Sequence, residues 1–108
     1  MKYLLMTLLG ALLSLPAAAV EAVTRTLVLK NHRYQPTELH IPANTRIKLE
    51  LINQDASPEE FESDEFQAEK IVMPNSSISL FIGPFKPGRY AFYGDFHQPT
   101  AQGMLVVE

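Results

Sequence analysis

The 108-residue chain contains no cysteine, so it forms no disulfide and offers no thiolate to a metal ion. Positive charge is also scarce, because 9 lysines and arginines face 12 acidic residues and the formal net charge is -3. This balance argues against nucleic acid as a partner. Glycine-rich phosphate loops and a nucleophile elbow are missing, which argues against nucleotide binding and hydrolytic catalysis.

The first 19 residues, MKYLLMTLLGALLSLPAAA, have the pattern of a secretory signal peptide. Lys2 supplies a positive end, an apolar stretch follows, and Pro16 precedes three small residues. The alternative is a retained membrane anchor, but the apolar stretch is shorter than the roughly 20 residues that span a bilayer. We therefore predict cleavage after Ala19 and one domain over residues 20–108.

Apolar and polar residues alternate along most of the remaining chain, which predicts half-buried strands. Leu27 and Leu29 share one face, as do Ile47, Leu49 and Leu51. Turn signals rich in proline, asparagine and glycine separate such segments. About seven short strands at this spacing predict an all-β sandwich with Greek-key connections. The acidic segment 58–70 is compatible with a short strand, a helical turn or a loop.

Two segments carry a recognisable order of residues. Asn53, Pro58 and Phe61 fit the pattern Asn-x-x-x-x-Pro-His-x-Phe, with glutamate at position 59 in place of histidine. Further on, KPGRYAFYGDFH fits Lys-Pro-Gly-x-Tyr-x-Phe-x-Cys-x-x-His, with Gly94 in place of cysteine. On these motifs the chain resembles the cupredoxin family over essentially all of residues 20–108, and the resemblance implies a cupredoxin-like Greek-key sandwich.

The resemblance also implies where a metal would bind, and there the chain departs from the family. Of the four usual copper ligands only His97 is retained, because Glu59, Gly94 and Ala101 occupy the other three positions. A blue-copper centre needs a thiolate, which glycine cannot supply. Carboxylate and imidazole donors suit iron, manganese or divalent copper better than monovalent copper. We therefore expect a metal site with a changed preference.

Glu59, Asp95 and His97 are the predicted ligands of that site. Asp95 is two residues from His97 and is expected to bind through oxygen or to orient the imidazole. The alternatives are a surface glutamate, a turn-forming aspartate and a loop histidine that bonds to backbone. Weaker candidates are Glu60, Glu62, Glu69 and Met73. For Glu60 and Glu62 the alternative is a solvated acidic edge. For Glu69 it is a surface ion pair with Lys70, and for Met73 it is packing in the core.

Two further patterns bear on the site. Alternation along a strand sends Glu60 and Glu62 to one face and Glu59 with Phe61 to the other, so both pairs cannot line one inward site. His32 and His40 fall on the early strands of the predicted sandwich, where either is an alternative component of a second metal site.

The segments NQDASPEEFES, EKIV, GPFKPGRYAFYGDFH and TAQG resemble more narrowly the small periplasmic cupredoxin-like components of bacterial ferrous-iron uptake systems. This resemblance implies a periplasmic protein that binds iron, copper or both and works beside an iron permease and a periplasmic metal-binding partner. It implies a contribution to iron oxidation before transport, with the membrane reached only through the partner. The alternatives are a non-blue copper carrier or electron-transfer protein and a metal-free binding module.

Overall fold

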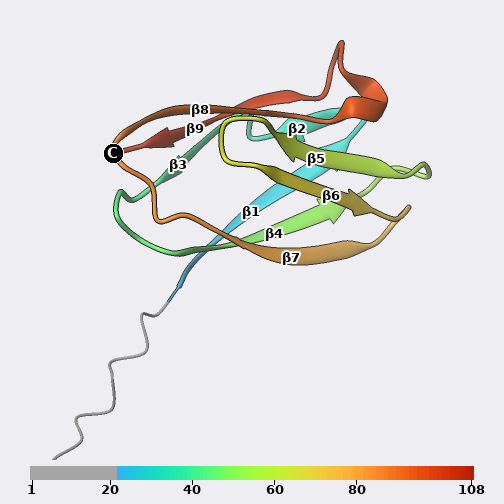
Figure 1. Cartoon of the computed structure of the whole chain (residues 1–108). Helices are drawn as coiled ribbons and strands as arrows, with labels where there is room; N and C mark the ends of the chain where they lie inside the picture. Colours follow the sequence, from blue (N-terminus) through green and yellow to red (C-terminus); the bar gives the residue numbers. More distant parts are fainter. Residues whose placement is uncertain (1–21) are drawn as a thin grey trace, which may run out of the picture.

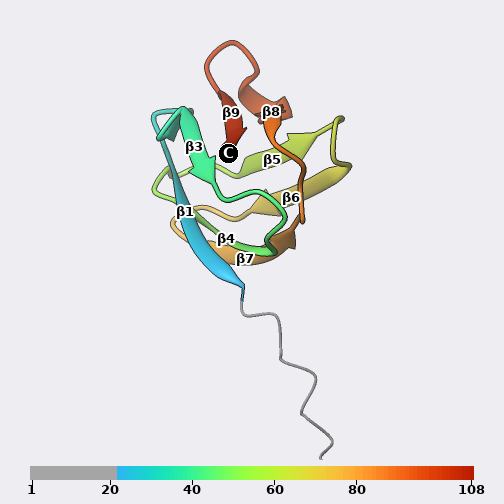
Figure 2. The same cartoon turned by 90° about the vertical axis from the view of Figure 1, so that its left-hand side faces the viewer.

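The computed structural model describes residues 22–108, which form two packed sheets (Figures 1 and 2). One sheet has the strand order β2 (Arg33–Gln35), β1 (Val23–Lys30), β4 (Ile47–Asn53), β7 (Ser77–Ile82). The other has the order β3 (Glu38–Ile41), β9 (Gln102–Val107), β8 (Gly88–Tyr93), β5 (Glu59–Ser63), β6 (Ala68–Val72). A 3-10 turn, η1 (Asp95–His97), lies in the connection from β8 to β9. The predicted all-β Greek-key sandwich is confirmed, with nine strands rather than about seven.

The core lies between the sheets and follows the alternation of the sequence. Leu27 and Leu29 of β1 are fully buried, as are Ile47, Leu49 and Leu51 of β4. β1 and β4 run parallel with Leu27 beside Leu51, so their apolar faces form one continuous surface. Burial of such side chains stabilises the fold by about 1.5–3 kcal/mol each.

The acidic segment 58–70 forms two strands of the five-stranded sheet. β5 and β6 pair antiparallel, with Glu59 opposite Val72 and Ser63 opposite Ala68. The side chain of Phe61 is fully buried, and it packs on Phe92 with ring centroids 5.2 Å apart. This aromatic contact anchors β5 to the core. The acidic sequence of segment 58–70 did not by itself decide between a strand, a helical turn and a loop.

Several chain segments meet at one end of the sandwich. β1 and β4 both finish there, β5 and β9 begin there, and η1 follows β8 at the same end. The C-terminus lies at the opposite end (Figure 1). This loop-rich end of the sandwich therefore carries side chains from loops that are far apart in the sequence.

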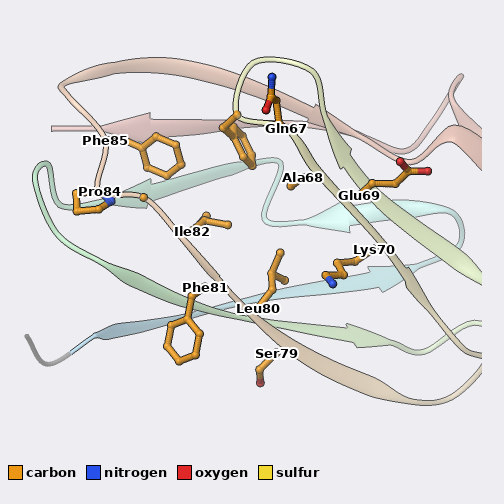
Figure 3. Close-up of a pocket in the computed structure, with 12 residues that line it drawn as sticks. Gln67, Ala68, Glu69, Lys70, Ser79, Leu80, Phe81, Ile82, Pro84 and Phe85 are labelled. Atoms are coloured by element: carbon orange, nitrogen blue, oxygen red, sulfur yellow. The ribbon is translucent and has the colours of Figure 1, made fainter.

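The two sheets part along one side, where the edge strands β6 and β7 leave an open groove of about 840 Å³ (Figure 3). Apolar side chains including Leu80, Ile82 and Phe85 form part of its lining, and Glu69 and Lys70 line it from β6. Among the described residues that line the groove there is no histidine. The groove is thus separate from the end of the sandwich at which β5 and β9 begin.

Across the described residues, no helix has the length and apolar character needed to cross a membrane. The predicted signal peptide and its cleavage point after Ala19 lie outside those residues. Both stay predictions.

Candidate metal centre

Two imidazoles and a carboxylate converge at the loop-rich end of the sandwich. Nδ1 of His32 lies 2.6 Å from Oε1 of Glu59, and Nδ1 of His97 lies 3.1 Å from Oε2 of the same carboxylate. The two imidazole rings stack, with centroids 3.6 Å apart and an interplanar angle of 17°. One ligand atom from each of the three residues lies within 4.8 Å of the others. The arrangement offers two nitrogens and an oxygen to a single ion.

Glu59 is the inner member of this group. It is the first residue of β5 and its side chain is fully buried, whereas those of His32 and His97 are 42% and 30% exposed. Within residues 22–108 no lysine or arginine forms an ion pair with Glu59; its ion-pair partners there are the two imidazoles. A buried carboxylate needs a compensating positive charge, and a metal cation held between the carboxylate and the imidazoles provides one. This donor set fits a bound divalent metal ion.

His32 reaches the site from a tight turn, which sequence reasoning missed by assigning it to a strand. Lys30 pairs with Arg33 across the β1–β2 hairpin, and Asn31 and His32 form the two-residue loop with φ of 54° and 57°. Positive φ at both positions is the mark of a type I′ hairpin turn. The Asn31-His32 pair between two alternating segments was the available signal for this turn.

Asn53 ties together the loops behind the site. Its side chain is buried, and Nδ2 donates to the carbonyls of Ser57, Val72 and Met73 at 2.9, 3.1 and 3.2 Å. Its Oδ1 accepts the backbone N–H of Asp55 at 2.9 Å. The one side chain therefore fixes both the loop that leads to Glu59 and the residues that follow β6.

Replacing Asn53 with alanine is expected to lower the free energy of unfolding by roughly 2–4 kcal/mol, because three buried or part-buried carbonyls and one N–H lose their partner. Urea denaturation of both proteins measures this difference. Gln54→Ala, at the exposed neighbouring position, is the control. A loss in N53A within the roughly 0.5 kcal/mol typical of surface substitutions would show that the loops hold without this residue.

Three acidic residues form a second group on the other face of β5. Carboxylate oxygens of Glu60, Glu62 and Asp95 lie within 4.8 Å of one another. A hydrogen bond with Glu60, aided by partial desolvation, raises the pKa of Glu62. The predicted separation of Glu59 and Phe61 from Glu60 and Glu62 agrees with this arrangement. Glu60 is nevertheless buried rather than part of a solvated edge.

Asp95 does not join Glu59 and His97, so this part of the predicted ligand set is corrected. Its backbone N–H donates to Oε1 of Glu60 at 3.0 Å, and its Oδ1 accepts from Nε2 of Gln98 at 2.7 Å. The reason is the 3-10 turn, in which residues two apart point about 120° away from each other. His97 faces Glu59, and Asp95 faces the second acidic group.

Tyr34 lies between the two groups. Its hydroxyl donates to the carbonyl of Glu60, and its ring packs edge-on against Phe92 with centroids 4.9 Å apart. Burial raises the pKa of Tyr34, and the carboxylates of Glu59 and Glu60 raise it further. The phenol therefore stays protonated and keeps donating to the backbone of β5.

The remaining candidates lie away from the imidazole pair. Glu69 lies on exposed β6 at the groove, and no ion pair with Lys70 occurs among the described residues. The side chain of Met73 is 59% exposed rather than in the core, and its ligand role stays a prediction. His40 contacts Glu108 through Nδ1 at 2.6 Å and pairs with Val106 at the far end of β9, so it belongs to neither group.

Comparison with known proteins assigns the fold to a family. The family model described as "Cupredoxin-like domain" matches residues 3–107. The chain belongs to the cupredoxin-like family. A relative in Rickettsia prowazekii, an uncharacterized protein, is 46% identical over 81 residues, which make up 75% of this chain and 65% of that protein. The aligned region thus spans slightly less than two thirds of the relative.

Solved structures of other proteins share the sandwich at low sequence identity. A reduced-state amicyanin mutant is 20% identical, with a TM-score of 0.62 over 85% of this chain and 87% of that one. The metal-binding domain of the Cu(I)-exporting P-type ATPase CopA of Streptococcus pneumoniae, solved with Cu(I), is 12% identical, with a TM-score of 0.66 over 82% and 97% of the two chains. These similarities establish a shared fold.

The position of the usual cupredoxin thiolate is closed in this member of the family. A Cβ at Gly94 would lie 2.7 Å from the carbonyl oxygen of Glu60 and 3.1 Å from Cβ of Ala101. The backbone N–H of Gly94 donates to the carbonyl of Ala101 at 2.9 Å, which draws the two positions together. Direct chain packing therefore fills the space at Gly94, and the candidate donors are His32, Glu59 and His97.

Proposed function

We propose that this cupredoxin-like protein binds divalent copper without sulfur ligands, through His32, Glu59 and His97. The observation that carries the proposal is the fully buried carboxylate of Glu59, whose two oxygens face two stacked imidazoles. Nitrogen and oxygen donors in a tetragonal field suit divalent copper, whereas monovalent copper prefers thiolate and thioether. The copper-binding proteins among the structural neighbours support the choice of metal.

Each residue has a distinct part in this proposal. Glu59 supplies negative charge from the interior and neutralises part of the charge of the ion. His32 and His97 bind through ring nitrogens and, being partly exposed, leave a path from solvent. Copper held there would supply one-electron redox chemistry, with the harder donors favouring the higher oxidation state.

Titration with Cu²⁺ is expected to give one tightly bound ion and a higher melting temperature. At a free concentration one hundred times Kd, binding stabilises the folded state by about 2.7 kcal/mol. A small domain gains roughly 4–8 °C per kcal/mol, so the rise should be roughly 10–20 °C. Calorimetry and thermal melts measure stoichiometry and stability.

Two histidine variants make this titration specific. H97A should lose the melting shift, whereas H40A should keep it, because His40 lies at the opposite end of the sandwich. If no metal raises the melting temperature of the unaltered protein, the protein is instead a metal-free binding module. Equal losses in H97A and H40A would point to adventitious binding by surface histidines.

A second candidate function rests on the same donors. Two histidines and one carboxylate are the ligand set of many non-haem ferrous sites. Combined with the resemblance described above, this favours a periplasmic protein that handles or oxidises ferrous iron before an iron permease and its metal-binding partner transport it. Anaerobic titration with Fe²⁺ separates the two, because a copper protein would show no Fe²⁺-dependent stabilisation and an iron protein would.

A further inference from the structure

The Asn31-His32 turn presents one of the proposed ligands from a backbone with positive φ at both of its residues. Both residues adopt left-handed φ values, a conformation that costs most non-glycine residues roughly 1–2 kcal/mol and that asparagine tolerates better. His32 also has to hold its ring against that of His97, at 3.6 Å between centroids. A two-residue loop with a partly exposed side chain does not secure this placement by packing alone. Some other contact must hold the turn.

Asp55 makes that contact. Its Oδ1 accepts the backbone N–H of Asn31 at 2.7 Å, and its Oδ2 accepts that of His32 at 3.0 Å. The two residues of the turn are thus held by the two oxygens of one carboxylate, whose side chain is only 11% exposed. Hydrogen bonds to an ionised acceptor are about twice as strong as neutral ones.

Asp55 is itself fixed from both sides. Its backbone N–H donates to Oδ1 of Asn53 at 2.9 Å, and its carbonyl accepts the N–H of Asn75 at 3.0 Å. Its Oδ2 also lies 3.6 Å from Nδ1 of His32, an ion-pair contact that is longer than the 2.6 Å between that nitrogen and Oε1 of Glu59. The carboxylate therefore makes its hydrogen bonds to the backbone of the turn and approaches the ring only at the longer distance.

We propose that Asp55 is a positioning residue that places His32 in the metal centre, an inference that rests on the proposed function of that centre. Asp55 lies outside the group of ligand atoms and contributes by fixing the turn. Partners that orient a ligand typically change metal affinity 10- to 100-fold when removed. Loss of Asp55 should therefore resemble partial loss of His32.

The test compares D55A and D55N with the unaltered protein, loaded with Cu²⁺. Affinity should fall roughly 10- to 100-fold, and electron paramagnetic resonance should show one coordinated imidazole nitrogen where the unaltered protein shows two. The double variant D55A/H32A should bind no more weakly than H32A alone, because both changes remove the same ligand. D64N, which removes a carboxylate charge from the β5–β6 turn, is the matched control and should keep both nitrogens.

The metal-free protein gives an independent readout. In D55N the ring-proton chemical shifts of His32 and His97 should move toward unstacked values, while D64N leaves them unchanged. A D55N spectrum with intact stacking, or two copper-bound nitrogens at unaltered affinity, would overturn the positioning role even if the melting temperature drops. If the unaltered protein binds no metal but D55N unstacks the rings, the proposed metal-binding function is wrong. The role of Asp55 in positioning His32 against His97 is then still supported.

Discussion

Replacing Glu59 with glutamine is expected to abolish tight binding of divalent metal. Glutamine preserves the volume at this fully buried position but removes the negative charge on which both imidazoles converge. The affinity for Cu²⁺ should fall by more than the roughly 10- to 100-fold that loss of a supporting residue costs, because a ligand itself is lost. Isothermal titration calorimetry of E59Q measures the change.

Glu60 provides the matched control for this variant. It is the next residue on β5, is also buried, and directs its carboxylate to the backbone N–H of Asp95 instead of an imidazole. E60Q should keep its copper affinity within about tenfold, below the full effect of losing a supporting partner. Unchanged affinity in E59Q, or an equal loss in E60Q, would contradict the assignment of Glu59 as the inner ligand.

Restoring the cysteine of the family pattern at Gly94 is expected to destabilise the protein rather than create a blue-copper centre. The new Cβ would lie 2.7 Å from the carbonyl oxygen of Glu60, a backbone atom that cannot move aside without displacing β5. Overpacking of this kind costs roughly 1–3 kcal/mol. Chemical denaturation of G94C measures the cost, and visible absorption after addition of copper reports any thiolate bond.

Gly94→Ala separates the two effects of that substitution. It adds the same Cβ without sulfur, so it should lose a similar free energy of unfolding. The φ of Gly94 is -112°, which any residue adopts, so the penalty comes from contact and not from backbone conformation. A G94C protein as stable as the unaltered one, with an intense visible thiolate-to-copper band, would show that the thiolate space is open after all.

The fold was predictable from the sequence because burial follows the period of the strands. Leu27, Leu29 and the three apolar residues of β4 are fully buried as their alternation predicts. The early strands were expected around His32 and His40, but the bounds of β2 and β3 could not be predicted, because three and four residues carry no clear period. For β5 a strand was one of three alternatives left open, because glutamates at the buried positions 59 and 60 break the alternation of apolar and polar residues.

The site was only partly predictable. Glu59 and His97, assigned by the family pattern, do lie side by side, with Oε2 and Nδ1 3.1 Å apart. His32 was missed because it reaches Glu59 across 27 positions of sequence from a turn, and spacing along the chain says little about such contacts. Asp95 was placed wrongly because it lies two residues before His97 in a 3-10 turn, where side chains at that spacing point in different directions.

Anomalous X-ray diffraction at the copper edge, from crystals of the protein loaded with Cu²⁺, tests the central claim most directly. The account predicts one strong peak within bonding distance of His32, Glu59 and His97, at roughly 2.0–2.2 Å from nitrogen and oxygen, the range seen for a comparable divalent ion. A peak on the carboxylates of Glu60, Glu62 and Asp95, or no ordered copper at all, would contradict it.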